Sequence, residues 1–324
     1  MNFQEKSPKV LCDFLKYLMA IRNYSLKTIK LYNNELLMFF KFLKEYMSLN
    51  IQIKNFNVFI LAQVKESTII AYLVYSNYYR NNSSRTRQRK LSIIRSFFKW
   101  LFINYPPFNY MENPTKYIPN IESVVRLPKY LNIENARKIQ TIFNVNNSKF
   151  PNRNNMIISM FLHTGMRASE LINLNISDIN FTKKTILVKG KNSKERVVYI
   201  DKVLLSKLKK YLKIRNKNKK ILNINDALFI SYQNKRIGID CVEDICAKAY
   251  KLMGLSEYGY NVHTLRHTAA TLIYRETRDI VILKEFLGHA QISTTQIYTH
   301  IINDEVKNAV DSNPLNIHIN EKVA

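Results

Sequence analysis

Three kinds of side chain that can do chemistry recur between His263 and Tyr298. Arg266 follows His263 by 3 residues, His289 follows Arg266 by 23, and Tyr298 follows His289 by 9. A tyrosine hydroxyl is a nucleophile, arginine stabilises developing negative charge, and histidine carries protons. Together with Arg167, these residues supply what is needed to attack a phosphodiester without a metal ion.

Both arginines are expected at the starts of helices. Arg167 follows Thr164-Gly165, and Arg266 lies just inside a helix expected to begin near His263. A cation in a first turn opposes the helix dipole, but it becomes favourable if it shares an anion with the free N–H groups there. Two guanidinium groups would then hold the oxygens of one phosphate. The alternative is a pair of ordinary surface arginines.

The histidines raise the question of a metal. His263 and His267 are four residues apart, but no Glu lies between them as in H-E-x-x-H and no cysteine pair supports a zinc site. We therefore predict no metal, with one of the two facing the chemistry and His267 packed. Gly288 is expected just beyond the end of a helix, which places His289 in a turn.

The nucleophile and the general acid are the hardest to choose. Residues 293–296 form a capping-box pattern that places Tyr298 in the second turn of a helix. Because the chain has 20 tyrosines, Tyr298 stands out only through its place in the pattern. Lys191, in a polar turn between two predicted strands, could donate a proton to a leaving oxygen. Lys194 is nearly as good a choice, and a solubilising surface lysine is the alternative.

Composition limits the class of protein. The 324 residues suffice for two domains, and 46% apolar content with only 6 Gly and 8 Pro predicts a globular, mainly helical chain. The formal net charge is +26, with an excess of +12 in residues 1–108 and +14 in residues 129–324. Two basic lobes fit a polyanionic partner, although charge does not separate DNA from RNA or from a general solubility charge.

Apolar periodicity predicts four helices in residues 1–108, capped or started near Leu11, Ser25, Ser67 and Ser84. The fourth carries basic residues toward its start, where an external phosphate would explain them and a solvated face is the alternative. These candidate DNA contacts are Arg85, Arg87, Arg89, Lys90 and Arg95.

Prolines and lost periodicity mark residues 109–128 as an extended linker. Beyond it, helices are predicted over 132–143, 155–163 and 207–220. Strands are predicted over 185–188 and 196–200, with a possible third over 227–230. A C-terminal tail begins at about 301 and contains an amphipathic stretch near 306–310.

The remaining features concern the compartment. Three cysteines without a CxxC pair, Cys12, Cys241 and Cys246, are expected to be reduced, and no apolar run approaches the ~20 residues of a membrane span. We expect a cytoplasmic protein with no membrane partner.

The stretch from His263 to Tyr298 and two further motifs resemble the tyrosine recombinase (phage integrase) family, most closely its bacterial Xer-type members. The two further motifs are Thr164-Gly165-Met166-Arg167-Ala168-Ser169-Glu170-Leu171 and Gly190-Lys191-Asn192-Ser193-Lys194-Glu195-Arg196. The resemblance covers essentially the whole chain. It implies a four-helix, SAM-like core-binding domain at 1–108 and a helical catalytic domain with a small antiparallel sheet at 129–324. Together these would form a C-shaped clamp around double-stranded DNA.

The resemblance also implies roles for the site residues. Tyr298 would attack the scissile phosphate and leave a 3′-phosphotyrosyl bond and a free 5′-hydroxyl. Arg167 and Arg266 would stabilise the transition state, Lys191 would be the general acid, and His263 and His289 would assist. No cofactor is implied. Family members act as tetramers on two duplexes through a Holliday junction, so a homo-tetramer or a hetero-tetramer with a paralogous recombinase is expected.

The motifs fit more than one biological role. Xer-type dimer resolution and mobile-element integration or excision differ in target site, which these motifs do not reveal. A catalytically silent DNA-binding protein and a type IB topoisomerase-like relaxing enzyme are the alternative functions. Two departures from the family pattern are small: Asn192 stands where glycine is frequent, and Phe286 where leucine is more usual.

Overall fold

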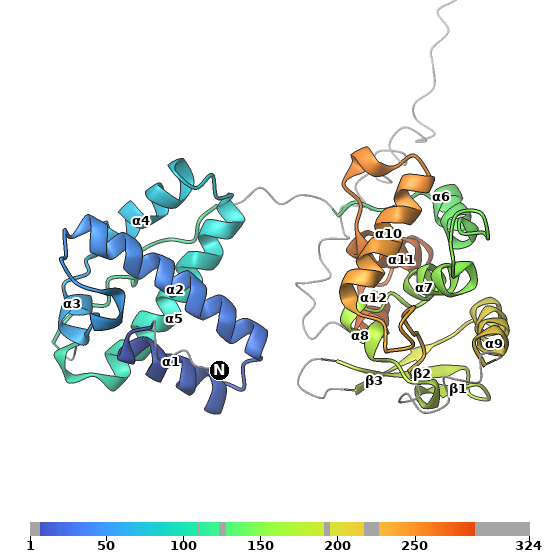
Figure 1. Ribbon diagram of the computed structural model, residues 1–324, viewed down its shortest axis with the longest axis horizontal. Helices are drawn as coiled ribbons and strands as arrows, with labels where there is room; N and C mark the ends of the chain where they lie inside the picture. Colours follow the sequence, from blue (N-terminus) through green and yellow to red (C-terminus); the bar gives the residue numbers. More distant parts are fainter. Residues whose placement is uncertain (1–6, 109, 123–127, 191–194, 217–226, 289–324) are drawn as a thin grey trace, which may run out of the picture. The chain divides into compact units, whose positions relative to one another are not determined.

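The computed structural model describes residues 7–108, 110–122, 128–190, 195–216 and 227–288 (Figure 1). The chain divides into two compact units, Met1–Val125 and Arg126–Ala324. This division falls within the segment predicted as a linker. No helix among the described residues is both long and apolar enough to cross a membrane.

The N-terminal unit packs its helices around an aromatic core that includes Phe14, Phe39 and Phe97, all fully buried. Phe14 and Phe97 meet edge to face with ring centroids 5.2 Å apart. Within the described residues the α-helices of this unit are α1 (Lys9–Ala20), α2 (Leu26–Tyr46), α3 (Val58–Ala62), α4 (Glu66–Tyr78) and α5 (Ser84–Asn104). Short 3₁₀ helices lie at Ile53–Asn55 and Pro106–Phe108.

Helix starts follow the predicted caps in part. Ser25 caps α2 by accepting a hydrogen bond from the Thr28 N–H at 3.3 Å, as predicted. Ser67 is not a cap, because α4 begins one residue earlier, at Glu66. The short helix α3 has no counterpart in the predicted pattern; its cap is Asn57, whose side chain accepts from two backbone N–H groups.

The proline-rich segment after α5 is held against the N-terminal unit as far as Ile121. Ile118 is 6% exposed within the core of that unit. The Arg95 guanidinium donates to the Ile118 carbonyl and to the Asn120 side chain. Gln88 accepts from the Ile121 N–H at 2.6 Å. These bonds from α5 make the segment part of the unit, which differs from the extended linker predicted for it.

The C-terminal unit combines helices with a small sheet, which Figure 1 shows at one end of the unit. Helix α7 is its central element, with Ile157, Ile158 and Phe161 fully buried. Within the described residues its α-helices are α6 (Ile133–Lys138), α7 (Pro151–Thr164), α8 (Ala168–Asn173), α9 (Lys202–Asn216), α10 (Ile239–Leu252), α11 (Val262–Thr277) and α12 (Ile280–Leu287). Short 3₁₀ helices lie at Ile139–Thr141, Ile176–Asp178 and Ser256–Tyr258.

The sheet has the order β1-β2-β3 and is antiparallel, with β1 at Ile179–Asn180, β2 at Thr185–Lys189 and β3 at Glu195–Tyr199. The predicted hairpin is therefore confirmed. The predicted third strand at 227–230 is wrong: Ala227 and Ile230 form only isolated bridges, to Asn175 and Arg236. The segment between those bridges is buried for packing, so its apolar residues imitate a strand without extending the sheet.

Candidate active site

A left-handed glycine creates the turn that presents Arg167. Gly165 ends α7 at φ 58°, and Arg167 is the N-cap of α8, as predicted. A Cβ on Gly165 would lie 2.7 Å from the Phe286 ring, so this position requires glycine for space as well as for conformation. The departure at Phe286 is thus a packing feature of the turn.

Glu170 fixes the Arg167 side chain. The Arg167 Nη1 donates to Glu170 Oε1 at 2.7 Å, and the Arg167 backbone N–H donates to Oε2 at 2.7 Å. The carboxylate is 3% exposed whereas the Arg167 side chain is 41% exposed. A buried anion therefore holds one edge of a guanidinium whose remainder faces solvent, where it can meet a ligand.

Arg266 reaches the same turn from α11. It is 6% exposed and donates to the backbone carbonyls of Gly165 and Leu287, the latter at 2.8 Å. Asn261 caps α11 by accepting from the His263 N–H at 2.8 Å. Arg266 thus ties the end of α7 to the end of α12, and the Gly165 carbonyl that it binds lies two residues before Arg167 in the chain. Both arginines of the expected pair are thus anchored at this turn, Arg167 by a carboxylate and Arg266 by backbone carbonyls; that they hold one phosphate stays a prediction.

The two histidines of α11 differ in environment. His263 is exposed in the first turn. Burial, with further contributions from His263 and Arg266, lowers the pKa of His267 to about 4. His267 is therefore neutral near pH 7 and packed, as the sequence indicated. Among the described residues, no three His, Cys, Asp or Glu side chains gather as a metal site.

Three candidate residues, Lys191, His289 and Tyr298, lie outside the described residues. The elements that lead into two of them are described. Strand β2 ends at Lys189, before Lys191, and α12 ends at Gly288, whose φ of 61° fits the helix-ending glycine predicted before His289. The tail from about 301 also lies outside the described residues.

Two charged residues of this region were missed as site residues by the sequence reasoning. Glu170 holds Arg167, and Arg196 Nη2 donates to the same Glu170 carboxylate at 2.9 Å. Burial lowers the pKa of Arg196, and the Glu170 charge opposes that shift. The Arg-x-x-Glu spacing in a first helical turn was the available signal for Glu170. For Arg196, the signal was an arginine at an inward-facing position of a predicted strand.

The basic residues of α5 separate into exposed and engaged groups. Lys90 corrects the prediction: its side chain is 3% exposed, and its ammonium donates to Glu35 at 2.6 Å and to Tyr72 at 3.3 Å. A lysine buried against a carboxylate is not available to DNA. Arg95 donates its hydrogen bonds to Ile118 and Asn120, within the segment that ends at Ile121. Arg85, by contrast, is exposed.

Arg87 and Arg89 of α5 lie between these extremes. The Arg87 Nη2 donates to Ser84 at 3.2 Å within a half-buried side chain. Arg89 donates to Glu35 at 2.8 Å and stays 49% exposed. Arg89 therefore keeps donors on the surface, and with Arg85 it is the better candidate for a phosphate contact.

Known proteins match both units. The model of the phage integrase family matches residues 130–305, and that of the phage integrase N-terminal SAM-like domain matches residues 11–103. A tyrosine recombinase XerC of Caldanaerobacter subterraneus subsp. tengcongensis is 35% identical, covering 97% of this chain and 90% of the relative. One of Thermodesulfovibrio yellowstonii is 33% identical, with 90% and 91% covered.

Solved structures of other proteins also align with this chain. The XerH site-specific recombinase in a post-cleavage complex with palindromic difH aligns with a TM-score of 0.72 and 26% identity, covering 93% of this chain and 84% of that one. A lambda integrase dimer bound to a COC′ core site, 18% identical with a TM-score of 0.63, shares the fold over 89% of this chain and 75% of its own.

The chain belongs to the phage integrase family, and it is an enzyme of the tyrosine recombinase class, which breaks and rejoins DNA. Within that class it is Xer-like, since its XerC relatives match it along nearly the full length.

Proposed function

We propose that Tyr298 is the nucleophile of this recombinase and that Arg167 and Arg266 stabilise its transition state. The tyrosine oxygen forms a bond to phosphorus while the bond from phosphorus to the 5′-oxygen breaks. Lys191 donates the proton that the departing 5′-oxygen needs, and His263 and His289 assist proton transfer and phosphate binding. Because the phosphotyrosyl ester conserves the bond energy, the 5′-hydroxyl of another strand can reverse the step without ATP.

The observation that carries this proposal is the convergence of Arg167 and Arg266 on the turn at Gly165. Arg266 is fixed by two backbone carbonyls and Arg167 by a buried carboxylate. Preorganised donors of this kind stabilise charge on a phosphoryl group without reorganising during the reaction. Removing one such donor typically costs a factor of about 10²–10³ in rate.

We further propose an Xer-type role on double-stranded DNA, since the curated relatives are XerC recombinases and XerH was solved on difH. The two basic units would close as a clamp on a duplex, and four subunits, identical or paired with a paralogue, would exchange strands through a Holliday junction. Such a protein would act on the chromosome in the cytoplasm. Integration or excision of a mobile element uses the same chemistry on another site.

Trapping the covalent adduct tests the chemistry. A nicked duplex carrying the chain's own site, recovered from bound genomic fragments, should give a denaturation-resistant protein–DNA adduct that Tyr298→Phe abolishes. An undiminished adduct in Tyr298→Phe would overturn the assignment of the nucleophile. Site binding without cleavage by the wild-type protein would instead support a silent DNA-binding protein. Relaxation of supercoiled DNA that lacks the site would support a topoisomerase-like enzyme.

A further inference from the structure

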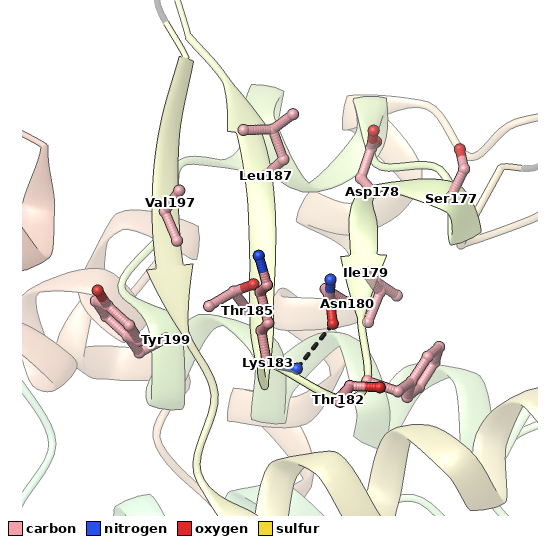
Figure 2. Close-up of a pocket in the computed structure, with 11 residues that line it drawn as sticks. Ser177, Asp178, Ile179, Asn180, Thr182, Lys183, Thr185, Leu187, Val197 and Tyr199 are labelled. Carbon is pink, nitrogen blue, oxygen red and sulfur yellow. Dashed lines mark hydrogen bonds between the residues drawn. The ribbon is translucent and has the colours of Figure 1, made fainter.

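Strand β3 turns an arginine toward the protein interior. Alternate residues of a strand face opposite sides of the sheet. Val197 and Tyr199 are 54% and 79% exposed on the outer face shown in Figure 2, where they line a shallow pocket. Val198 is 4% exposed on the inner face. Arg196 shares that inner face, paired with Val188 of β2, and its side chain is 17% exposed.

The Arg196 guanidinium is only partly satisfied. Its Nη2 donates to Glu170, but its buried Nε and Nη1 have no hydrogen-bond partner among the residues that the structure describes. A Cβ on Gly288 would lie 2.5 Å from the Arg196 Nη1. The guanidinium is therefore pressed against the backbone at the end of α12, directly before His289.

If Arg196 served only the stability of the fold, this arrangement would be unfavourable. A buried donor without a hydrogen-bond partner has lost its hydration without gaining a bond in return, which destabilises the fold. A methionine at position 196 would fill similar space without that cost, and replacing buried ion pairs by apolar residues is often neutral or stabilising. Positions that break the burial pattern without a stabilising gain are expected at functional sites.

We propose that Arg196 is a positioning residue of the active site: it shares the Glu170 carboxylate with Arg167 and so holds the Arg167 guanidinium, with its charge uncompensated, toward the DNA phosphate. The inference rests on the phosphate-stabilising role proposed above for Arg167. Arg196 itself does not touch the reacting atoms.

The charge balance explains why two arginines share one acid. Glu170 binds Arg167 through Oε1 and Arg196 through Oε2. Two cations and one anion leave one net positive charge in the cluster. Without Arg196, Glu170 and Arg167 form a neutral pair, and the carboxylate offsets more of the charge that Arg167 offers to a phosphate. The Gly288 contact also places Arg196 where it supports the turn that leads to His289.

Replacing Arg196 separates this role from a structural one. In full-length Arg196→Met, we expect adduct formation on the nicked duplex to slow by about 10- to 100-fold, as misplacement of a catalytic group does. The thermal midpoint should be unchanged or higher. Arg196→Lys, which restores the charge, should recover part of the rate. On a duplex with a neutral methylphosphonate at the scissile position, Arg196→Met should approach the wild type, because less charge then needs stabilisation.

Arg153→Met is a matched control, since Arg153 is also a partly buried arginine of the C-terminal unit and donates to the Ile230 carbonyl at 2.8 Å. It should lower stability without changing the rate per folded molecule. A wild-type rate in Arg196→Met, or an equal loss on the charged and neutral substrates, would overturn the inference. If the wild-type protein itself forms no adduct while Arg196→Met keeps wild-type stability, the result contradicts the proposed function. The role of Arg196, which rests on that function, is then contradicted as well.

Discussion

At the scale of single residues, the charges of α5 have unequal tasks. Arg85 is exposed, whereas Lys90 is buried against Glu35. Each phosphate contact contributes about one unit to the slope of log affinity against log salt. We expect Arg85→Ala to reduce that slope by about 1 and Lys90→Met to leave it unchanged. Filter binding of the full-length variants over a salt series checks this, and an equal reduction in both variants would contradict it.

His267 gives a prediction about pH. Burial lowers the pKa of His267 to about 4 from its ordinary value of 6.5. Between these two pH values the unfolded chain binds a proton at His267 and the folded chain does not. The free energy of unfolding therefore falls as the pH drops through this window. The full effect is on the order of 3 kcal/mol.

The measurement for His267 is urea unfolding of the wild type and His267→Gln at about pH 7 and about pH 4.5. The wild type should lose more stability on acidification than the glutamine variant, which cannot titrate. Parallel losses in the two proteins would show that His267 does not carry the effect.

The site residues differ in how clearly the sequence alone indicates them. Arg167 was found because a helix-starting arginine after a glycine needs an explanation. Glu170 does not stand out in the sequence, because an acid in a first helical turn is already explained as a capping residue. The local pattern at Arg196 predicts only a strand, because the burial of Arg196 depends on the positions of α8 and α12, which no local pattern encodes.

At the scale of elements, the junction of α7 and α12 depends on Gly165. Alanine there would meet a positive φ and the Phe286 ring at 2.7 Å. We expect Gly165→Ala to cost about 1 kcal/mol for the backbone and a further 1–3 kcal/mol for the clash. Gly254→Ala is the matched control, since its φ is +70° and nothing lies within 4 Å of the added methyl group.

A second substitution isolates the clash. Phe286→Leu, which shortens the side chain facing Gly165, should recover part of the loss in Gly165→Ala and none of the loss in Gly254→Ala. Chemical unfolding of the single and double variants measures this coupling. Strict additivity at Gly165 would mean that backbone strain alone accounts for its cost.

Elements were predictable where one local rule was sufficient. Ser25 caps α2 and the hairpin strands alternate, so both were found. Strand β1 has only two residues, too few for a period, and it exists because β2 offers it an edge. The segment 227–230 has the composition of a strand but lacks a continuous partner. Pairing is a long-range property, which apolar composition does not encode.

At the scale of the whole molecule, positive charge is spread over both parts of the chain. Residues 1–108 carry an excess of +12 and residues 129–324 an excess of +14. The affinity of such a protein for DNA comes mainly from the release of counterions from phosphates. This part of the affinity is independent of base sequence. Charge of this kind explains retention on DNA, whereas recognition of one site requires contacts to base edges.

This distribution of charge predicts that the affinity for DNA depends strongly on salt. If both halves of the chain contact phosphates, affinity for a duplex should fall by roughly 10³–10⁵ between about 50 and 200 mM salt, as it does for proteins with 6–10 such contacts. Titrating the full-length protein against a labelled duplex, with and without its recombination site, gives the slope for each. We expect similar slopes with different absolute affinities, because phosphate contacts set the slope and base contacts set the difference. A shallow slope on both duplexes would contradict binding by two basic units.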